Sequence, residues 1–352
     1  MTLTKDNSTI MRGLAISSIV LHNFIHMPRF GFTAENEFIH TDGQFDLFLA
    51  SLTSGGLFHA AGEILSFLGW MGVPVFVFLS GYGLTQKYES GKQPPRFHSY
   101  IWHSWRKLFL LLLPVTLIFL LIHLGDWSYL GRSMASLTLL ANLAAVYPPT
   151  HVYWYFGLTF ELYLLYLSIY RIKDWRVLLG MVLVVWGLQI TLVTLGKTEA
   201  IDWNMHNFLG WIPEFVLGVV VGRYSKTSFH LPTWGWMFVA VFSAGMMVLG
   251  NANAYLWIFI RLFAISFFAS MAMLVGKTPV IRDVFIHIGT ISAFLFAIHP
   301  LARTLASIIL PLHASLCAKT ALYVLMAYLG AIAYRIIHKK YLSGFLKYPK
   351  VS

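Results

Sequence analysis

The sequence predicts an all-α polytopic membrane protein with about ten transmembrane helices. Of its 352 residues, 58% are hydrophobic and only 11% are charged, whereas a soluble domain carries about 25% charged residues. The mean hydropathy of +0.69 over the whole chain requires many apolar segments rather than a single anchor. These values exclude a water-soluble globular protein.

The expected spans are stretches of roughly 20 mostly apolar residues, the length that crosses a bilayer as a helix. Two further stretches, 43–62 and 133–147, are short or amphipathic, and we expect them outside the membrane, on its surface. No small-residue cleavage site follows the first span, so it is expected to be retained. The ten spans lie at 10–28, 66–86, 107–125, 152–171, 176–196, 205–223, 232–250, 254–276, 285–310 and 316–337.

The basic residues predict the orientation of these spans. With the N-terminus inside, 19 of the 25 Lys and Arg residues fall in inner segments and four in outer ones. Acidic residues such as Glu35 and Asp46 lie in the outer segments. Because Lys and Arg of short loops stay on the cytoplasmic side, both termini are predicted to be cytoplasmic.

The domain organisation is expected to be one transmembrane domain over residues 1–352, without an appended soluble domain. The net charge of +11 follows the loop pattern, so it does not indicate nucleic acid as a partner. The one cysteine, Cys317, excludes an internal disulfide. The oligomeric state is left open by the sequence.

Ionisable side chains inside spans cost a few kcal/mol each, so each is a candidate for function or for a buried polar pair. His22 lies ten residues beyond Arg12, which places it about 15 Å deeper and near the middle of the hydrocarbon core. A neutral imidazole there can act as a base or can bond a neighbouring helix, and the same alternatives hold for His26. The other such residues are Glu161, His206, Glu214, Arg261, His287, His299 and Arg303, of which Glu214 and Arg261 could form a pair.

The segment between the second and third spans is basic and aromatic. Arg106 and Lys107 could bind the phosphates of an anionic donor there. The same residues are equally explained by the positive-inside rule. No phosphate-binding glycine loop, no two-histidine motif with a glutamate base and no cysteine cluster occurs, so no metal site is predicted.

At this point the sequence resembles the membrane-bound acyltransferases of acyltransferase family 3, over nearly the whole chain. Five motifs in order carry the resemblance. The first two are MRGLAISSIVLHNF, with Arg12 and a following histidine, and GWMGVPVFVFLSGYGL, with Gly72 and Ser80. The next two are WRKLFLLLLP, with Arg106, Lys107 and Pro114, and YWYFGLTFELYLL, with Trp154, Tyr155 and Glu161. The last is IGTISAFLFAIHP, with Gly289, Ser292, His299 and Pro300.

Two departures from the family pattern affect the site. The usual separation of arginine and histidine is about eleven residues, which keeps them on one helix face. Arg12 and His22 are ten apart, so they lie about 80° apart around the helix, and Asn23 takes the usual histidine position. Either His22 keeps the catalytic role, or Asn23 orients the substrate while His22 or His26 is the base. In the basic motif, Leu110 to Leu113 replace a later arginine.

The resemblance implies an acyl-coenzyme A-dependent O-acyltransferase in the inner, cytoplasmic membrane of a bacterium. It would move an acyl group, most often acetyl, from acetyl-coenzyme A to a hydroxyl of a surface carbohydrate or lipid-linked sugar. His22 would serve as base or acyl carrier. Arg12, Arg106, Lys107, Ser80 and Tyr82 would contact the donor. Trp154, Glu161, Arg261 and His299 are further polar candidates, and proteins of polysaccharide assembly are possible partners besides membrane lipid.

Two rival functions share these features. A transporter or flippase also combines about ten helices with ionisable residues near the membrane centre, but it often shows inverted repeats with paired broken helices, which this sequence lacks. A non-catalytic scaffold of a polysaccharide-assembly complex is the other. Cleavage of acyl-coenzyme A separates the enzyme from the transporter, and loss of surface modification in His22→Ala separates it from the scaffold.

Overall fold

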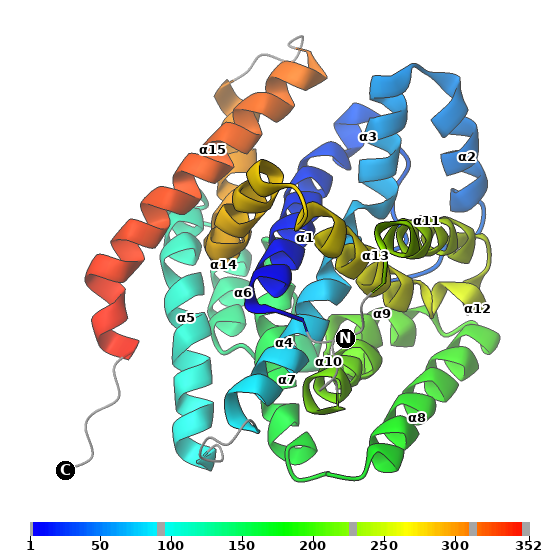
Figure 1. Cartoon of the computed structure of the whole chain (residues 1–352). Coiled ribbons are helices and arrows are strands. Elements are labelled where there is room, and N and C mark those ends of the chain that lie inside the picture. Colours follow the sequence, from blue (N-terminus) through cyan, green and yellow to red (C-terminus); the bar gives the residue numbers. More distant parts are fainter. Residues whose placement is uncertain (1–2, 90–95, 225–230, 310–314, 347–352) are drawn as a thin grey trace. The chain divides into compact units, whose positions relative to one another are not determined.

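The computed structural model describes residues 3–89, 96–224, 231–309 and 315–346, and these residues are helical with no strand, so the all-α prediction is confirmed (Figure 1). The α-helices are α1 (Lys5–Ile25), α2 (Gln44–Ser54), α3 (Leu57–Leu68), α4 (Gly72–Tyr88), α5 (Phe97–Ile122), α6 (Trp127–Leu137), α7 (Trp154–Ile169), α8 (Trp175–Thr194), α9 (Thr198–His206), α10 (Ile212–Tyr224), α11 (Thr233–Leu249), α12 (Ala254–Trp257), α13 (Ile260–Val275), α14 (Pro279–Ile309) and α15 (Leu316–Ile337).

Within the described residues, eight helices are long and apolar enough to cross a membrane, or nine if one bent pair counts as a single span. The chain is therefore a polytopic membrane protein, as predicted. The expected span 205–223 corresponds to this pair, Thr198–His206 and Phe208–Tyr224, which meet at 76°. The expected span 254–276 holds α13, whose 16 residues fall short of the roughly 20 that cross a bilayer.

The second span begins earlier than the sequence indicates. The stretch 43–62 forms α2 and the start of α3, and α3 continues through a short 3-10 turn at Gly69–Met71 into α4. The apolar run Leu57–Tyr88 therefore measures 32 residues. Pro74 lies in the first turn of α4, where its missing N–H costs no helical hydrogen bond, so a helix can restart there.

The described residues divide into two compact units. The first comprises Met1–Lys92, Ile172–Met205 and Leu209–Ser292. In it, α4 packs along α10 and α11 along α13, while α1 contacts α3, α4 and α13. Helices α4 and α10 approach very closely, since a Cβ added at Gly81 would lie 2.2 Å from the carbonyl oxygen of Phe215. Such small-residue contacts are the usual means of packing membrane helices.

A charged cluster joins chain segments at one end of this unit. Glu89, which follows α4, accepts hydrogen bonds from Nε and Nη2 of Arg223 at 2.7 and 2.8 Å, and from Lys173 at 3.2 Å. Burial would raise the pKa of Glu89, but the hydrogen bonds and charges of Arg223 and Lys173 outweigh burial and lower the pKa. The ends of α4 and α10 are thereby tied to the segment before α8.

The second unit comprises Gln93–Arg171, His206–Phe208 and Ala293–Ser352. Here α5 packs against α7, and the Tyr100 hydroxyl donates to the carbonyl of Tyr163 at 2.9 Å. The stretch 133–147 forms the end of α6 and a 3-10 turn at Ala141–Ala144, and neither is a candidate span. Its expected place on the membrane surface stays a prediction.

Candidate active site

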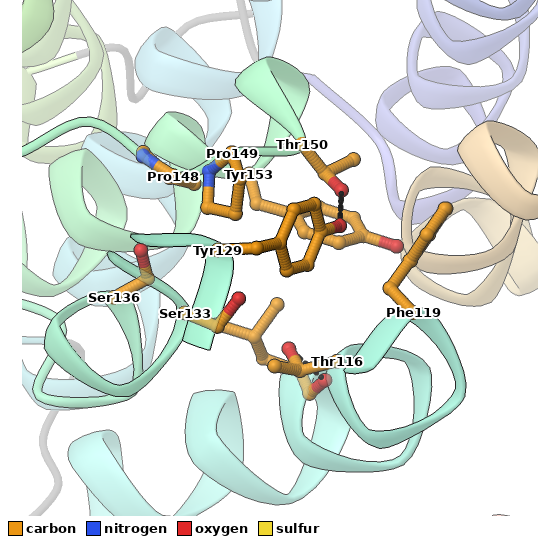
Figure 2. A pocket seen from close by; sticks show the side chains of 10 residues that line it. Thr116, Phe119, Tyr129, Ser133, Ser136, Pro148, Pro149, Thr150 and Tyr153 are labelled. Atoms are coloured by element: carbon orange, nitrogen blue, oxygen red, sulfur yellow. Dashed lines mark hydrogen bonds between the residues drawn. The ribbon is translucent and has the colours of Figure 1, made fainter. Parts of the chain in front are cut away.

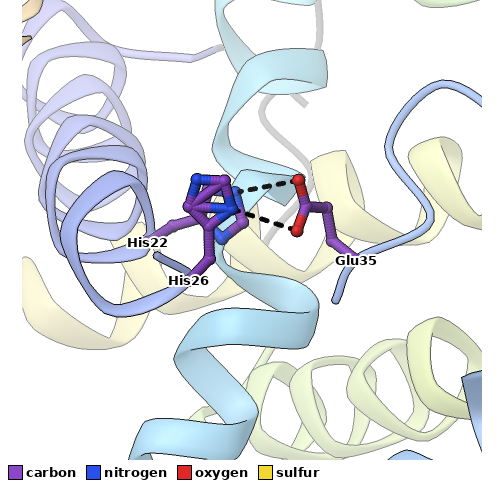
Figure 3. Close-up of side chains that lie close together, drawn as sticks. All are labelled: His22, His26 and Glu35. Carbon is purple, nitrogen blue, oxygen red and sulfur yellow. Dashed lines mark hydrogen bonds and ion pairs between the residues drawn. The ribbon is translucent and has the colours of Figure 1, made fainter. Parts of the chain in front are cut away.

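The last turn of α1 carries the two histidines that the sequence singles out. Thr4 caps the N-terminus of α1 by accepting a hydrogen bond from the backbone of Asn7, so the helix begins at Lys5, earlier than expected. At its other end the helix stops at Ile25, so His22 lies in the last turn, while its expected depth in the membrane stays a prediction. His26 follows four residues later, and the two rings are 4.6 Å apart between centroids (Figure 3). Residues four apart share one face of a helix.

A carboxylate from the following loop completes a cluster with these rings. Oε2 of Glu35 lies 3.1 Å from Nδ1 of His26, and Oε1 lies 4.0 Å from Nε2 of His22. From sequence, Glu35 is one of several acidic residues expected outside the spans, with no sign of a contact to the histidines. A usable signal is its position, since it is an acidic residue in the short segment that directly follows the histidine pair.

The loop is anchored on both sides of Glu35. Before it, the backbone N–H of Thr33 donates to Glu63 at 3.1 Å, and the Thr33 carbonyl accepts from Ser66 at 2.8 Å. After it, the carbonyl of Asn36 accepts from the indole of Trp257 at 2.6 Å. Because Glu63 and Asn36 are fully buried, these contacts are well shielded from water. The loop therefore holds the Glu35 carboxylate against the histidines.

The contact of Nδ1 of His22 decides which of its two ring nitrogens carries the proton in the neutral ring. Nδ1 of His22 is 3.1 Å from the carbonyl oxygen of Leu65 on α3. A carbonyl only accepts, so Nδ1 must carry the proton, and in the neutral ring Nε2 keeps the lone pair. The residue as a whole is buried, with 2% of its surface exposed. Its basic nitrogen thus points toward the carboxylate side of the cluster.

The approach of α3 and α4 to α1 depends on Gly69. A Cβ at that position would lie 2.6 Å from Cβ of His22. Only glycine allows the short turn between α3 and α4 to come this close to the histidine. Ser18, one turn earlier on α1, donates to the Gly69 carbonyl at 2.8 Å and fixes the same contact.

The two other predicted site residues of α1, Asn23 and Arg12, make hydrogen bonds within their own helix. Asn23 donates through its amide to the carbonyl of Ile19 at 3.0 Å, within its own helix. The side chain of Arg12 is half-buried, and its Nε donates to the Ser8 carbonyl at 3.4 Å. Because α1 is one continuous helix, Arg12 lies about 15 Å from His22 along the axis.

The predicted donor contacts divide between the two units. On α4, the Ser80 hydroxyl donates to Phe76 of the same helix, and Tyr82 donates to the Leu3 carbonyl, both at 2.8 Å. Arg106 is half-buried and Lys107 is exposed on α5 of the second unit. A role of these four residues in donor binding stays a prediction.

Arg261 belongs to a buried ion pair rather than to the histidine cluster. Its Nε donates to Glu214 at 2.9 Å, and both side chains are at most 2% exposed. Its guanidinium also lies 5.1 Å from the ring centroid of Trp211 and donates to Gln189 at 3.4 Å. The suggested pair of Glu214 and Arg261 is therefore confirmed, and it links α10 with α13.

The second unit holds the remaining candidates. Glu161 on α7 is buried and accepts a hydrogen bond from the backbone of Phe208 at 2.9 Å. Trp154 is buried at the start of α7, 5.5 Å from the ring centroid of His206. His299 is fully buried on α14, with Nδ1 3.2 Å from the Leu295 carbonyl of its own helix. Each has a structural role in this unit, while a catalytic role stays a prediction.

A hydroxyl-lined pocket in the second unit is too small for a sugar. Tyr129 and Thr150 share a hydrogen bond of 3.0 Å at its wall, and Ser133, Thr116 and Tyr153 also line it (Figure 2). Its volume of about 10 Å³ holds one water molecule at most. Substrate binding therefore requires another place or a rearrangement.

Comparison with known proteins gives one match. A family model described as an acyltransferase domain matches residues 6–336. No curated protein and no solved structure matches the chain significantly. The matched range includes His22, His26 and Glu35 and reaches into both units.

Proposed function

Since this chain belongs to acyltransferase family 3, and is therefore a membrane acyltransferase, we propose that it is an acyl-coenzyme A-dependent O-acyltransferase. It moves an acyl group, acetyl in the first instance, from the cytoplasmic side of a bacterial inner membrane. The acceptor is a hydroxyl of a surface carbohydrate or a lipid-linked sugar. The family assigns an enzyme, so a transporter or a scaffold is no longer the favoured reading.

The observation that supports this proposal is the cluster of His22, His26 and Glu35. Nδ1 of His22 donates to Leu65, so Nε2 is available as a base, and the Glu35 carboxylate 4.0 Å away favours the protonated ring that forms during the reaction. The Leu65 carbonyl orients the ring through Nδ1, as the second group of a catalytic triad orients its histidine.

The reaction then follows from these positions. Nε2 of His22 takes the proton of the acceptor hydroxyl while its oxygen attacks the thioester carbonyl. The carbon–sulfur bond breaks, and coenzyme A leaves as a thiolate that recovers the proton. In the second route, Nε2 itself attacks the thioester carbonyl and coenzyme A leaves as a thiolate. The acceptor hydroxyl then attacks the acyl group, the bond to Nε2 breaks, and the hydroxyl proton passes through His22 to the thiolate.

Arg12 fits the donor end of this path. It lies about 15 Å from His22 along α1, a distance that the extended pantetheine arm of a coenzyme A thioester can span. A guanidinium binds phosphate oxygens through paired hydrogen bonds. Arg12 would hold the nucleotide end of the donor while the thioester reaches the histidine.

The test uses the full-length protein in proteoliposomes with radiolabelled acetyl-coenzyme A and the carbohydrate fraction of envelopes from the producing cells. We expect label to enter carbohydrate in an alkali-labile ester, with one coenzyme A released per ester. Movement of substrate across the membrane without thioester cleavage would contradict the proposal. Arg12→Ala should weaken the thermal stabilisation by coenzyme A, whereas Arg282→Ala, at an arginine whose side chain is 40% exposed, should preserve it.

A further inference from the structure

The cluster of His22, His26 and Glu35 also has the ligand set of a metal site. One atom of each residue, a ring nitrogen or a carboxylate oxygen, lies within 4.8 Å of the others. Two histidines and one carboxylate, with positions left for water or substrate, are a common set for zinc and for other divalent transition metals. Sequence motifs did not indicate it, because the carboxylate comes from a separate loop.

The distances need little adjustment to hold an ion. Ligands about 2.0–2.2 Å from a tetrahedral zinc ion lie roughly 3.3 Å apart. The separation of Nδ1 of His26 and Oε2 of Glu35 is 3.1 Å, and that of Nε2 of His22 and Oε1 of Glu35 is 4.0 Å. These two separations are within about 1 Å of the coordination value, and all three ligand atoms lie within 4.8 Å of one another.

Hydrogen bonds from neighbouring groups hold His22 and the loop of Glu35 in place, as is usual for the ligands of a metal ion. Nδ1 of His22 donates to the Leu65 carbonyl, which orients Nε2 as a ligand. The loop bonds of Thr33 and Asn36 fix the position of Glu35 between them. The side chain of His22 is 3% exposed, whereas His26 is 26% and Glu35 17% exposed, so an ion can enter from one side.

We propose that His22, His26 and Glu35 form a site for a divalent transition metal ion, best suited to zinc, and that its occupancy switches off acyl transfer. The ion takes the lone pair of His22 that would deprotonate the acceptor, and it displaces the proton of His26 that faces Glu35. The inhibition rests on the proposed function, whereas the binding does not.

Binding is tested with the metal-free full-length protein and Co²⁺ as a spectroscopic probe. We expect one equivalent of Co²⁺ to give a visible ligand-field band that Zn²⁺ abolishes, and Zn²⁺ to raise the Tm. His26→Gln and Glu35→Gln should each lower the affinity at least about tenfold, whereas His287→Gln, an exposed histidine on α14, should not change it. Because the spectrum and the Tm shift are compared within each folded sample, loss of fold cannot imitate loss of binding.

Inhibition is tested by the amount of O-acyl ester formed, since zinc also binds the released thiol. Saturating Zn²⁺ should suppress ester formation, and a chelator should restore it. Absence of a cobalt band from an active protein overturns the metal site and leaves the proposed function intact. A cobalt band in a protein that forms no ester after chelation overturns the proposed function and leaves the metal site. Unchanged ester formation at saturating Zn²⁺ would contradict the proposal that the bound ion inhibits acyl transfer.

Discussion

The Glu35 carboxylate lies 3.1 Å from Nδ1 of His26, although the two residues are nine positions apart and belong to a loop and a helix end. This contact closes the segment between them onto the end of α1. It brings negative charge next to both rings of the histidine pair. We therefore expect Glu35 to act as a positioning residue for the proposed base, His22.

Replacement of Glu35 tests this positioning role. Glu35→Gln keeps the shape of the side chain but removes its charge, so we expect kcat to fall about 10–100-fold and the KM for the acyl donor to change little. Glu199→Gln, an exposed glutamate on α9, is the matched control. A kcat equal to that of the wild type would show that the carboxylate does not assist the histidines.

Substitution at Gly69 tests the close contact behind His22. The Cβ of Gly69→Ala would lie 2.6 Å from that of His22, so the turn must shift, and acyl transfer and Tm should both fall. Gly83→Ala meets no atom within 4 Å and should be neutral or stabilising, by up to about 1 kcal/mol, because alanine favours the helix. Equal effects of both substitutions would contradict the packing argument.

The sequence alone predicts the all-helical membrane fold because a bilayer imposes length and hydropathy on each span. The same pattern does not locate the bend after His206, because the two helices that meet there satisfy the length and hydropathy of a single span when taken together. It also cannot fix the start of α1, which depends on the cap at Thr4. The helix also ends at Ile25, shortly before Pro28 and earlier than the expected end at residue 28, which is why His22 lies closer to the helix end than expected.

The candidate site is predictable in part for a similar reason. His22 and His26 share a helix face by their spacing alone, which any helix would impose. Glu35 reaches them through a loop whose course depends on distant partners, Glu63 and Trp257. Neither partner is indicated by local sequence. The sequence suggests that Arg261 and Glu214 could pair, because ionisable side chains inside spans are costly unless they are paired.

The buried pair of Arg261 and Glu214 should affect stability mainly when one partner is removed and the other charge stays buried alone. Arg261→Met leaves Glu214 buried without its partner, and we expect about 3–5 kcal/mol of destabilisation, seen as a large drop in Tm. The double variant Arg261→Met with Glu214→Leu should recover most of the loss. Additive losses in the double variant would show that the two residues stabilise the fold independently.

The Glu89 cluster predicts a pH dependence of stability. Since Arg223 and Lys173 lower the pKa of Glu89 below 4.5, its contribution is full above that pH and is lost as the pH falls through the folded-state pKa. Glu89→Gln should therefore lower Tm at pH 6–8, with the difference from wild type vanishing in acid. Asp283→Asn, which breaks a pair whose carboxylate is 66% exposed, should have little effect at any pH.

The central claim is that Nε2 of His22 carries out the acyl-transfer chemistry, and ester formation by His22→Gln tests it most directly. In proteoliposomes with acetyl-coenzyme A, we expect this variant to lose at least about 100-fold in ester formation. Stabilisation by coenzyme A should persist, and His287→Gln should match the wild type. Ester formation within about threefold of the wild type, in a His22→Gln sample of unchanged Tm, would contradict the account.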